Sequence, residues 1–283
     1  MQRKIRYGVL STAQIARNAH IPAARGAPNA EVVAISSRDA GRARHWADVL
    51  NIPTAYGAYQ DVLDDPAVEA IINPLPNSLH CEWTVKAAEA GKHILCEKPL
   101  AVTVAEAHRM IDAARANSVL LMEGFTPHFN PVLPYMRDVI GSGELGEVRL
   151  VRSELLHTIT DWEHDSCVKR ELAGGALLDA GCYCVNAVRT LVGQEPVSAL
   201  AYARIKTHHQ VDTTFVGLLR FPDDRVAYVA TGMEQPFRFA LEAIGTTGSI
   251  FTPNVFAGTE VEIRVGSAVR TVHFEPVDRF RQQ

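Results

Sequence analysis

Long apolar runs and dense runs of one charge are both missing from this sequence of 283 residues. The apolar stretches are interrupted well before the roughly 18 residues that a membrane span needs, so we expect no membrane association. The formal net charge is −4 without a basic patch, which argues against a nucleic-acid partner. No apolar signal core follows the basic residues at the start, and we therefore expect a cytoplasmic protein.

Cysteine is also scarce, and its spacing suggests neither a disulfide framework nor a metal. The five cysteines are odd in number and contain no Cys-x-x-Cys pair, so we expect reduced thiols. Cys182 and Cys184 alternate without a matching distal pair, which makes a poor zinc site. The eleven histidines show no ligand-spaced cluster either. A chain of this length can bury a sizeable core without disulfides or a structural metal.

The first part of the chain alternates between strand-like and helix-like apolar patterns. The predicted strands are residues 5–10, 31–36, 68–72, 93–96 and 120–125. Helical segments begin near residues 13, 42, 78 and 103, the last with a capping box of Thr103 and Glu106. This alternation is typical of an α/β Rossmann domain with a parallel, doubly wound sheet, which we assign to residues 1–125.

The pattern then changes to strands joined by short turns. The strand-like runs are residues 147–156, 197–205, 211–221, 225–231, 237–244, 260–265 and 270–274. Only residues 175–191 show helical periodicity in this part. We therefore predict a second, α+β domain over residues 126–276 with a large open antiparallel sheet.

The dinucleotide fingerprint Gly-x-Gly-x-x-Gly is absent from the first strand–helix turn, where small residues replace all three glycines. The turn still offers backbone N–H groups and the positive end of a helix dipole, both of which suit a pyrophosphate. An ordinary α/β turn is the alternative. The predicted phosphate-binding residues are Ser11, Thr12, Ala13, Gln14 and Ile15.

A carboxylate is missing directly after the second predicted strand, where it would bind the adenosine ribose and repel a 2′-phosphate. Ser37 and Arg38 stand there instead, and Arg42 follows one turn later. A hydroxyl and a guanidinium favour a phosphate, because the guanidinium supplies charge and paired donors. This predicts NADP over NAD, with a solvated surface arginine as the alternative.

A lysine follows the fourth predicted strand at the sheet edge where ligands of open α/β sheets bind. In Cys96-Glu97-Lys98-Pro99 the proline biases the backbone away from helix, so Lys98 can point into a crevice. Such a lysine can hydrogen bond a substrate hydroxyl or carbonyl and steer its proton. A surface salt bridge with Glu97 is the alternative.

An aspartate and a tyrosine form the second candidate for chemistry. Asp179 and Tyr183 lie four residues apart in the segment Gly-Gly-Ala-Leu-Leu-Asp-Ala-Gly-Cys-Tyr, residues 174–183. On a helix they would share a face, where a carboxylate and a phenol can orient a hydroxyl and move its proton. The alternative is a charge that stabilises the helix start and a tyrosine packed in the core.

Taken together and in this order, these motifs resemble the glucose–fructose oxidoreductase/inositol dehydrogenase/rhizopine-catabolism (Gfo/Idh/MocA) family. The resemblance runs through nearly the whole chain. It rests on Glu97-Lys98-Pro99, on the segment that contains Asp179 and Tyr183, on residues 71–80 and on residues 122–125. Tyrosine at position 183 looks like the branch that contains glucose–fructose oxidoreductase, xylose dehydrogenase and dihydrodiol dehydrogenase.

The resemblance implies a set of roles. Lys98 would be the catalytic lysine, with Asp179 and Tyr183 facing the reacting carbon. Tyr183 would take the proton of a substrate hydroxyl, aided by the charge of Lys98, while the carbon-bound hydrogen leaves as hydride to NADP. Further cofactor contacts would come from Leu75, Pro76, Asn77, His80, Glu97 and Lys98. His80 as a packing histidine is the alternative.

The implied substrate is a sugar or polyol, such as an aldose, or a trans-dihydrodiol, and no metal is required. Relatives of this branch associate through the open face of the antiparallel sheet, so we expect a homodimer or a larger homo-oligomer. The alternative function is a catalytically inactive NADP-binding regulatory protein. Intact Lys98, Asp179 and Tyr183 favour the enzyme.

Two segments depart from the family pattern. In residues 126–131, His128 and Asn130 stand where sugar-active relatives have arginine and histidine, which leaves the substrate open. Residues 277–283 look like the beginning of a C-terminal helix that is cut short. We expect reduced stability, or compensation by a partner subunit, because apolar surface on the first domain would be uncovered.

Overall fold

The computed structural model describes residues 3–283 and divides them into two units, each with its own core. The first unit runs up to Phe125 and includes Phe280–Gln283; the second is Thr126–Arg279.

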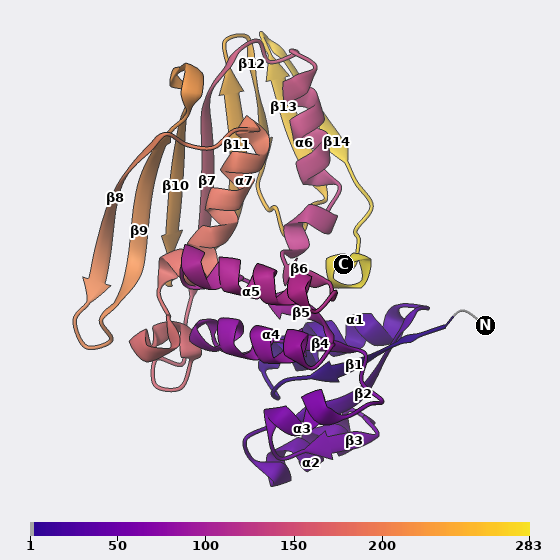
Figure 1. Cartoon of the computed structure of the whole chain (residues 1–283). Coiled ribbons are helices and arrows are strands. Elements are labelled where there is room, and N and C mark those ends of the chain that lie inside the picture. Colours follow the sequence, from indigo (N-terminus) through magenta and orange to yellow (C-terminus); the bar gives the residue numbers. More distant parts are fainter. Residues whose placement is uncertain (1–2) are drawn as a thin grey trace. The chain divides into compact units, whose positions relative to one another are not determined.

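The first unit is built on a six-stranded parallel sheet in the order β3-β2-β1-β4-β5-β6 (Figure 1). Its strands are β1 Ile5–Val9, β2 Ala30–Ser36, β3 Thr54–Tyr56, β4 Ala70–Asn73, β5 His93–Glu97 and β6 Leu121–Gly124. Its helices are α1 Ile21–Gly26, α2 Ala40–Val49, α3 Tyr59–Asp64, α4 His80–Glu89 and α5 Val104–Ala116. Two apolar clusters cover the sheet, one with α1 and α2 and the other with α3, α4 and α5. The predicted doubly wound α/β fold is confirmed.

Local sequence explains why these elements form where they do. The predicted capping box at α5 is present: Thr103 Oγ1 accepts from the Glu106 N–H, and Glu106 Oε2 accepts from the Thr103 N–H. The five predicted strands are found, but β3 and α3 were not predicted. β3 is three residues long, which is too short for a readable alternation.

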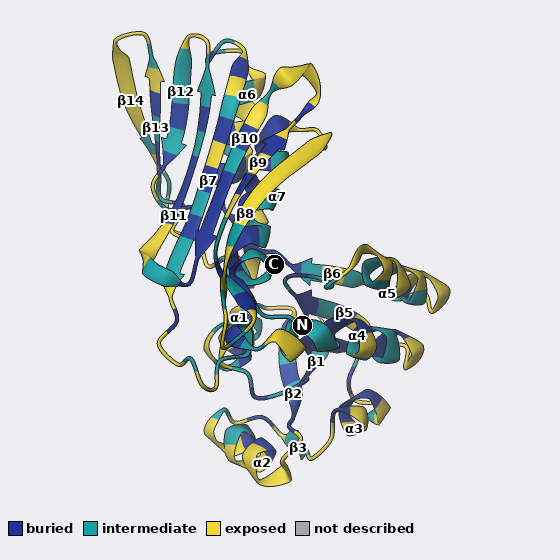
Figure 2. Ribbon diagram, turned by 90° about the vertical axis from the view of Figure 1, so that its left-hand side faces the viewer, coloured by how far each residue is buried: buried dark blue, intermediate teal, exposed yellow. Residues whose placement is uncertain are grey.

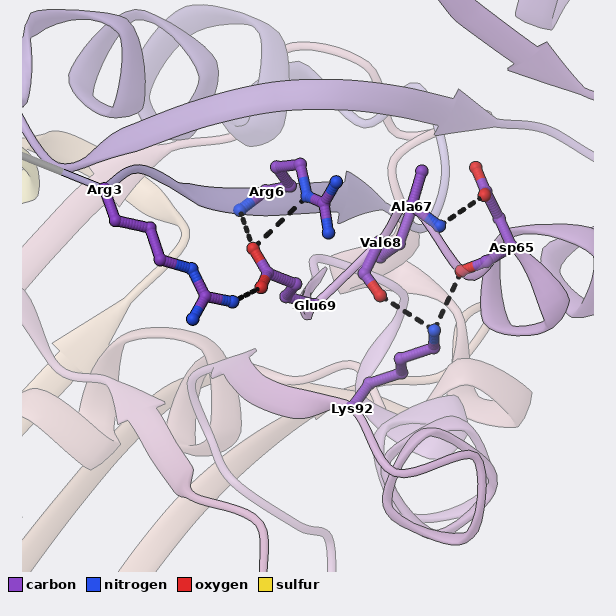
Figure 3. Close-up of polar contacts among 7 residues, drawn as sticks. All are labelled: Arg3, Arg6, Asp65, Ala67, Val68, Glu69 and Lys92. Carbon is purple, nitrogen blue, oxygen red and sulfur yellow. Dashed lines mark hydrogen bonds and ion pairs between the residues drawn. The ribbon is translucent and has the colours of Figure 1, made fainter.

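The amino-terminal edge of this sheet is fastened by charged side chains (Figure 3). Arg3 and Arg6 both donate to the Glu69 carboxylate just before β4. The buried Lys92 ammonium donates to the carbonyls of Asp65 at 2.8 Å and Val68 at 2.7 Å. Burial lowers the pKa of Lys92, since the charged form loses water there. These contacts tie the segments before β4 and β5 together, at the edge opposite the carboxyl ends of the strands.

The second unit is built on an eight-stranded sheet in the order β14-β13-β12-β11-β7-β10-β9-β8. Its strands are β7 Val148–Thr158, β8 Ser198–Lys206, β9 Val211–Arg220, β10 Val226–Gly232, β11 Glu234–Gly245, β12 Gly248–Thr252, β13 Glu260–Val265 and β14 Ala268–His273. Its helices are α6 Val132–Gly141, α7 Cys182–Val192 and the π-helical turn η6 Leu177–Gly181 that leads into α7. The short helix α8, Arg279–Gln282, begins at the boundary between the two units.

The predicted α+β domain with a large sheet is confirmed, with corrections. The sheet is mostly antiparallel, but β7 and β10 pair in parallel. Residues 175–191 are not its only helical segment, since α6 is a ten-residue helix whose apolar face packs into the core through Val132, Leu133 and Met136. The five-residue strand β12 was also not predicted.

Helices α6 and α7 cover one face of this sheet and leave the other face open (Figures 1 and 2). Along β7 the covered face receives Val151, Ser153 and Leu155, which are buried, while Arg152 and Glu154 lie on the open face. Strand register places one residue of each strand in a lateral row across the open face. This row is Leu200, Leu218, Tyr228, Arg152, Glu242, Phe251, Glu262 and Thr271. Figure 2 shows that the edge strands β8 and β14 are almost entirely exposed.

Candidate active site

The first unit brings most of the predicted cofactor residues to the carboxyl ends of its central strands. β1 lies between β2 and β4, so strand order reverses there, and ligands of open α/β sheets bind at such a switch point. The Leu10 N–H donates to the Ile72 carbonyl at 3.0 Å, and Ser36 Oγ donates to the Val9 carbonyl at 3.1 Å. These hydrogen bonds link the carboxyl ends of β1, β2 and β4 to one another.

The turn after β1 has the conformation that the glycine fingerprint normally provides. Ser11 has φ of 87°, in the left-handed region, and its Oγ accepts from the Ala13 N–H at 3.2 Å. A helical segment starts at Gln14 and includes a π-helical turn over Ala16–His20 before α1. The first N–H groups of a helix have no carbonyl partner within it, so they are available to an anion. Thr12 is buried, whereas Gln14 and Ile15 are exposed.

The basic residues after β2 lie on the surface beside a tyrosine. Ser37 is buried, while Arg38 and Arg42 are exposed at the start of α2. Burial raises the pKa of the Tyr59 hydroxyl, and the nearby Arg38 and Arg42 charges oppose this shift. The Asp39 carboxylate accepts from the Arg42 N–H at 2.7 Å and so caps α2. The segment therefore places two exposed guanidinium groups, which are suited to a phosphate, at the start of α2.

The loop after β4 is fixed from within by a fully buried histidine. His80 Nε2 lies 2.7 Å from the Leu75 carbonyl, and Nδ1 lies 2.8 Å from the Pro99 carbonyl. Burial lowers the pKa of His80, while the two carbonyl contacts act in the opposite direction. His80 thus joins the loop of Leu75, Pro76 and Asn77 to the loop that carries Lys98. Its predicted contact with the cofactor stays a prediction.

Glu97 forms a buried pair that was not predicted. Its Oε1 lies 2.6 Å from His20 Nε2, and its Oε2 accepts from the Lys98 N–H at 3.0 Å. Burial acts to raise the pKa of Glu97, but the hydrogen bond and charge of His20 outweigh it and hold the pKa below its usual value. The pair orients the backbone at Lys98, a half-buried residue at the end of β5.

The second unit positions Asp179 and Tyr183 on consecutive turns of η6 and α7. Asp179 Oδ2 lies 3.0 Å from Nε2 of His157, which comes from the end of β7. The turn begins at Gly175, whose φ of 122° suits glycine and whose Cα faces Asp212 so closely that a Cβ would lie 2.1 Å from Oδ1. The Gly-Gly motif is therefore required by backbone conformation and space.

Tyr183 projects from α7 into a cluster of aromatic rings. Its ring centroid lies 5.1 Å from that of Phe256 and 6.1 Å from that of Phe239. On another edge of the cluster, the Arg279 guanidinium lies 4.5 Å from the Phe256 ring centroid and donates to the Phe256 carbonyl at 2.5 Å. The Tyr183 ring thus packs among aromatic rings, and the residue is half-buried.

The segment that departs from the family pattern has a structural explanation for one of its two residues. Asn130 is buried; its Oδ1 accepts from the Val132 N–H at the start of α6, and its Nδ2 donates to the Val255 carbonyl. His128 as a whole residue is exposed, and its side chain hydrogen bonds Asn186 of α7. Partial burial of the imidazole lowers the pKa of His128.

Two partners of the predicted residues were missed, His20 and His157. His20 lies 77 positions from Glu97 in the chain, a separation that no local pattern can bridge. The sequence does indicate that His157 needs a polar partner. It follows Val151, Ser153 and Leu155 in the alternation that faces the core, so an imidazole there calls for a polar partner.

All five cysteines are free thiols. Within residues 3–283, no three His, Cys, Asp or Glu side chains are grouped so as to hold a metal ion. No helix among those residues is long and apolar enough to cross a membrane.

The strand order of the first sheet, followed by the large and mostly antiparallel second sheet, is that of a two-domain, dinucleotide-dependent oxidoreductase. The chain belongs to the Gfo/Idh/MocA family. The family model described as "Oxidoreductase family, NAD-binding Rossmann fold" matches residues 5–125, and the family's C-terminal domain model matches residues 134–251.

Curated relatives and solved structures agree with this assignment over almost the whole chain. D-xylose 1-dehydrogenase (NADP(+)) 2 from Haloferax volcanii is 34% identical over 98% of this chain and 86% of its own length. Trans-1,2-dihydrobenzene-1,2-diol dehydrogenase from Xenopus laevis is 33% identical over 88% of this chain and 75% of its own. A 3-ketoreductase from Actinomadura kijaniata, solved with NADP and TDP-benzene, is 29% identical and superposes with a TM-score of 0.94 over 99% of this chain and 87% of its own.

The His20–Glu97 pair predicts a specific acid sensitivity. Because the folded pKa of Glu97 lies below its ordinary value of 4.5, the ionised Glu97 carboxylate stabilises the fold above that pH, and this effect is lost as the pH falls through the folded pKa. We expect wild type to be more stable than Glu97→Gln near pH 6 and the difference to shrink toward pH 3. Urea unfolding at each pH measures it, with the exposed Glu82→Gln as control. A difference that stays constant with pH would contradict the assignment.

Proposed function

We propose that this protein is an NADP-dependent oxidoreductase that transfers a hydride between the nicotinamide and a carbon bearing a hydroxyl or carbonyl group of a sugar-like substrate. The observation that carries the proposal is the arrangement at the carboxyl edge of the first sheet. There the Ser11 turn, the two arginines after β2 and Lys98 after β5 all follow strands around the switch point. Dihydrodiols and TDP-linked sugars are the other substrates named for relatives.

The residues present fit the cofactor. The left-handed Ser11 leaves helix N–H groups for the pyrophosphate, from the turn Ser11, Thr12, Ala13, Gln14 and Ile15. Ser37, Arg38 and Arg42 suit the 2′-phosphate. We assign the nicotinamide half to the loops that His80 and Glu97 hold in place. These loops comprise Leu75, Pro76, Asn77, His80, Glu97 and Lys98.

We assign the proton chemistry to three side chains. The bound nicotinamide supplies the hydride acceptor or donor. Tyr183 takes the proton of the substrate hydroxyl, and returns it when a carbonyl is reduced. Lys98 places a positive charge at the substrate oxygen, which stabilises negative charge as it develops there. Asp179 accepts a hydrogen bond from the substrate and fixes its orientation.

The first experiment follows absorbance of the reduced nicotinamide with NADP or NAD and a panel of aldoses, inositols and trans-dihydrodiols. We expect turnover, and we expect Lys98→Met and Tyr183→Phe each to lower kcat by about 100-fold or more, because each removes a proton-transfer or charge-stabilising group. Lys86→Met, on the surface of α4, is the control. Tight NADP binding without turnover of any panel member would favour the regulatory alternative.

The assignment of Arg38 predicts cofactor preference. Arg38→Ala should raise KM for NADP roughly 10- to 100-fold, because a hydrogen bond to a charged group contributes about 1.5–3 kcal/mol. KM for NAD, which lacks the 2′-phosphate, should hardly change. Arg44→Ala removes a neighbouring arginine of α2 that pairs with Asp48 and should alter neither value. Equal effects of Arg38→Ala on both cofactors would refute the assignment.

We further propose a homo-oligomer formed through the open face of the eight-stranded sheet. On β8 and β9 this face exposes Leu200, Tyr202 and Leu218, which are 72%, 77% and 46% accessible. Toward β13 this face carries charged side chains of both signs around a hollow of about 580 Å³. Some of them form ion pairs, including Arg238–Glu154 and Arg264–Glu262. A face with an apolar half and a half of mixed charge can be self-complementary about a two-fold axis.

Charge introduced into the apolar half should separate the subunits. We expect the double variant Leu200→Asp/Leu218→Asp to have the mass of one chain by light scattering after size exclusion, because two carboxylates would be buried at the interface. Val104→Asp, an equally exposed position on α5, should keep the wild-type mass. A wild type that is monomeric at micromolar concentration would overturn the proposal.

A further inference from the structure

His157 occupies an unusual place for an imidazole. Strand alternation puts it on the covered face of β7, in line with the buried Val151, Ser153 and Leu155 and followed by the buried Ile159. A polar ring at such a position needs a hydrogen-bond partner, because burying it without one is costly. Its partner is Asp179 Oδ2, at 3.0 Å from Nε2.

The two backbones that carry this pair are fixed independently of it. The strand end is held by Thr158 Oγ1, which donates to the Gln235 carbonyl at 2.7 Å, and by the Ile159 N–H, which donates to the Met233 carbonyl at 2.9 Å. With the strand end anchored in this way, the His157 contact restricts rotation of the Asp179 side chain.

The turn that carries Asp179 has its own anchors. The Leu177 N–H donates to Asp212 Oδ2 at 2.8 Å, and Thr231 Oγ1 donates to the Ala176 carbonyl at 3.3 Å. These contacts come from β9 and β10, so the turn should keep its shape when His157 is replaced.

The pair is also less accessible to water than a comparable pair at the surface. The side chains of His157 and Asp179 are 25% and 18% accessible, whereas those of the otherwise similar pair His164–Asp161, at 3.1 Å, are 72% and 57% accessible. A hydrogen bond between partly buried groups restricts geometry more than one at the surface, where water competes. His164–Asp161 therefore serves as a matched control in the same unit.

We propose that His157 is a positioning residue for the reaction: it holds one oxygen of the Asp179 carboxylate and thereby directs the other toward the substrate beside Tyr183. This inference rests on the proposed function for the role of Asp179. His157 acts through Asp179 and needs no contact of its own with substrate or cofactor. In metal sites, loss of a residue that orients a ligand lowers affinity or activity 10- to 100-fold, and we expect an effect of about that size here.

The test combines single and double variants under the assay with NADP and the panel substrate that the wild type turns over fastest. His157→Leu should lower kcat roughly 10- to 100-fold and leave KM for NADP unchanged. His157→Gln, whose amide can donate from a similar position, should recover most of the loss. His164→Leu should have wild-type kcat, and thermal unfolding should show that all three variants are folded.

The Asp179→Asn background shows whether His157 acts through Asp179. Adding His157→Leu to Asp179→Asn should change kcat by less than about twofold, because the interaction is already altered. The same loss in both backgrounds, or wild-type kcat in His157→Leu, would overturn the inference. Wild-type kcat in Asp179→Asn alone would instead overturn the catalytic assignment of Asp179.

A crystallographic comparison decides the matter without turnover. In His157→Leu the Asp179 carboxylate should adopt a different or a split orientation relative to wild type. An unchanged carboxylate in that variant would refute the positioning role, whatever the substrate. If the wild type shows no turnover but the carboxylate is displaced in the variant, the proposed function fails while the structural part of this inference stands.

Discussion

The parallel pairing of β1 with β2 on one side and β4 on the other is the constraint on which the cofactor assignments depend. It brings Ser11, Ser37 and the loop after Asn73 to one edge, although these residues are far apart in the chain. Parallel strands with helical crossovers force all carboxyl ends to the same side. Glu69 and Lys92 make their polar contacts at the opposite edge, where the strands begin, and not at the carboxyl ends of the strands.

Buried histidines give the loops at this edge their shape. His80 bridges two carbonyls and His20 holds the Glu97 carboxylate, so the backbone on both sides of Lys98 is fixed by groups that lie below the surface. In the second unit the partly buried His157 contacts the Asp179 carboxylate in a similar way. In each case an imidazole fixes a segment or side chain to which we assign a functional role, consistent with the way supporting residues pre-organise sites.

The sequence predicted five of the six strands of the first sheet and the capping box, because these depend on local periodicity. Short elements such as β3 gave no periodic signal. Helix α6 was missed in a stretch that begins with prolines. The parallel pairing of β7 with β10 and the His20–Glu97 contact depend on residues far apart in the chain, which single-sequence patterns do not encode. The residues proposed for the site were found by their motifs and positions, whereas their histidine supports were not.

The position of β7 has a consequence for how the second unit can fold. β10 and β11 are consecutive in the chain but flank β7 on opposite sides, so the link at Met233 crosses over the end of β7. The parallel pairing of β7 with β10 therefore brings together strands that the whole α7–β9 segment separates in the chain. Closing that long loop is entropically costly, and pairings of this kind fold slowly. Once formed, these pairings place β7 between β10 and β11, so the strand whose end carries His157 has a hydrogen-bonded neighbour on each side.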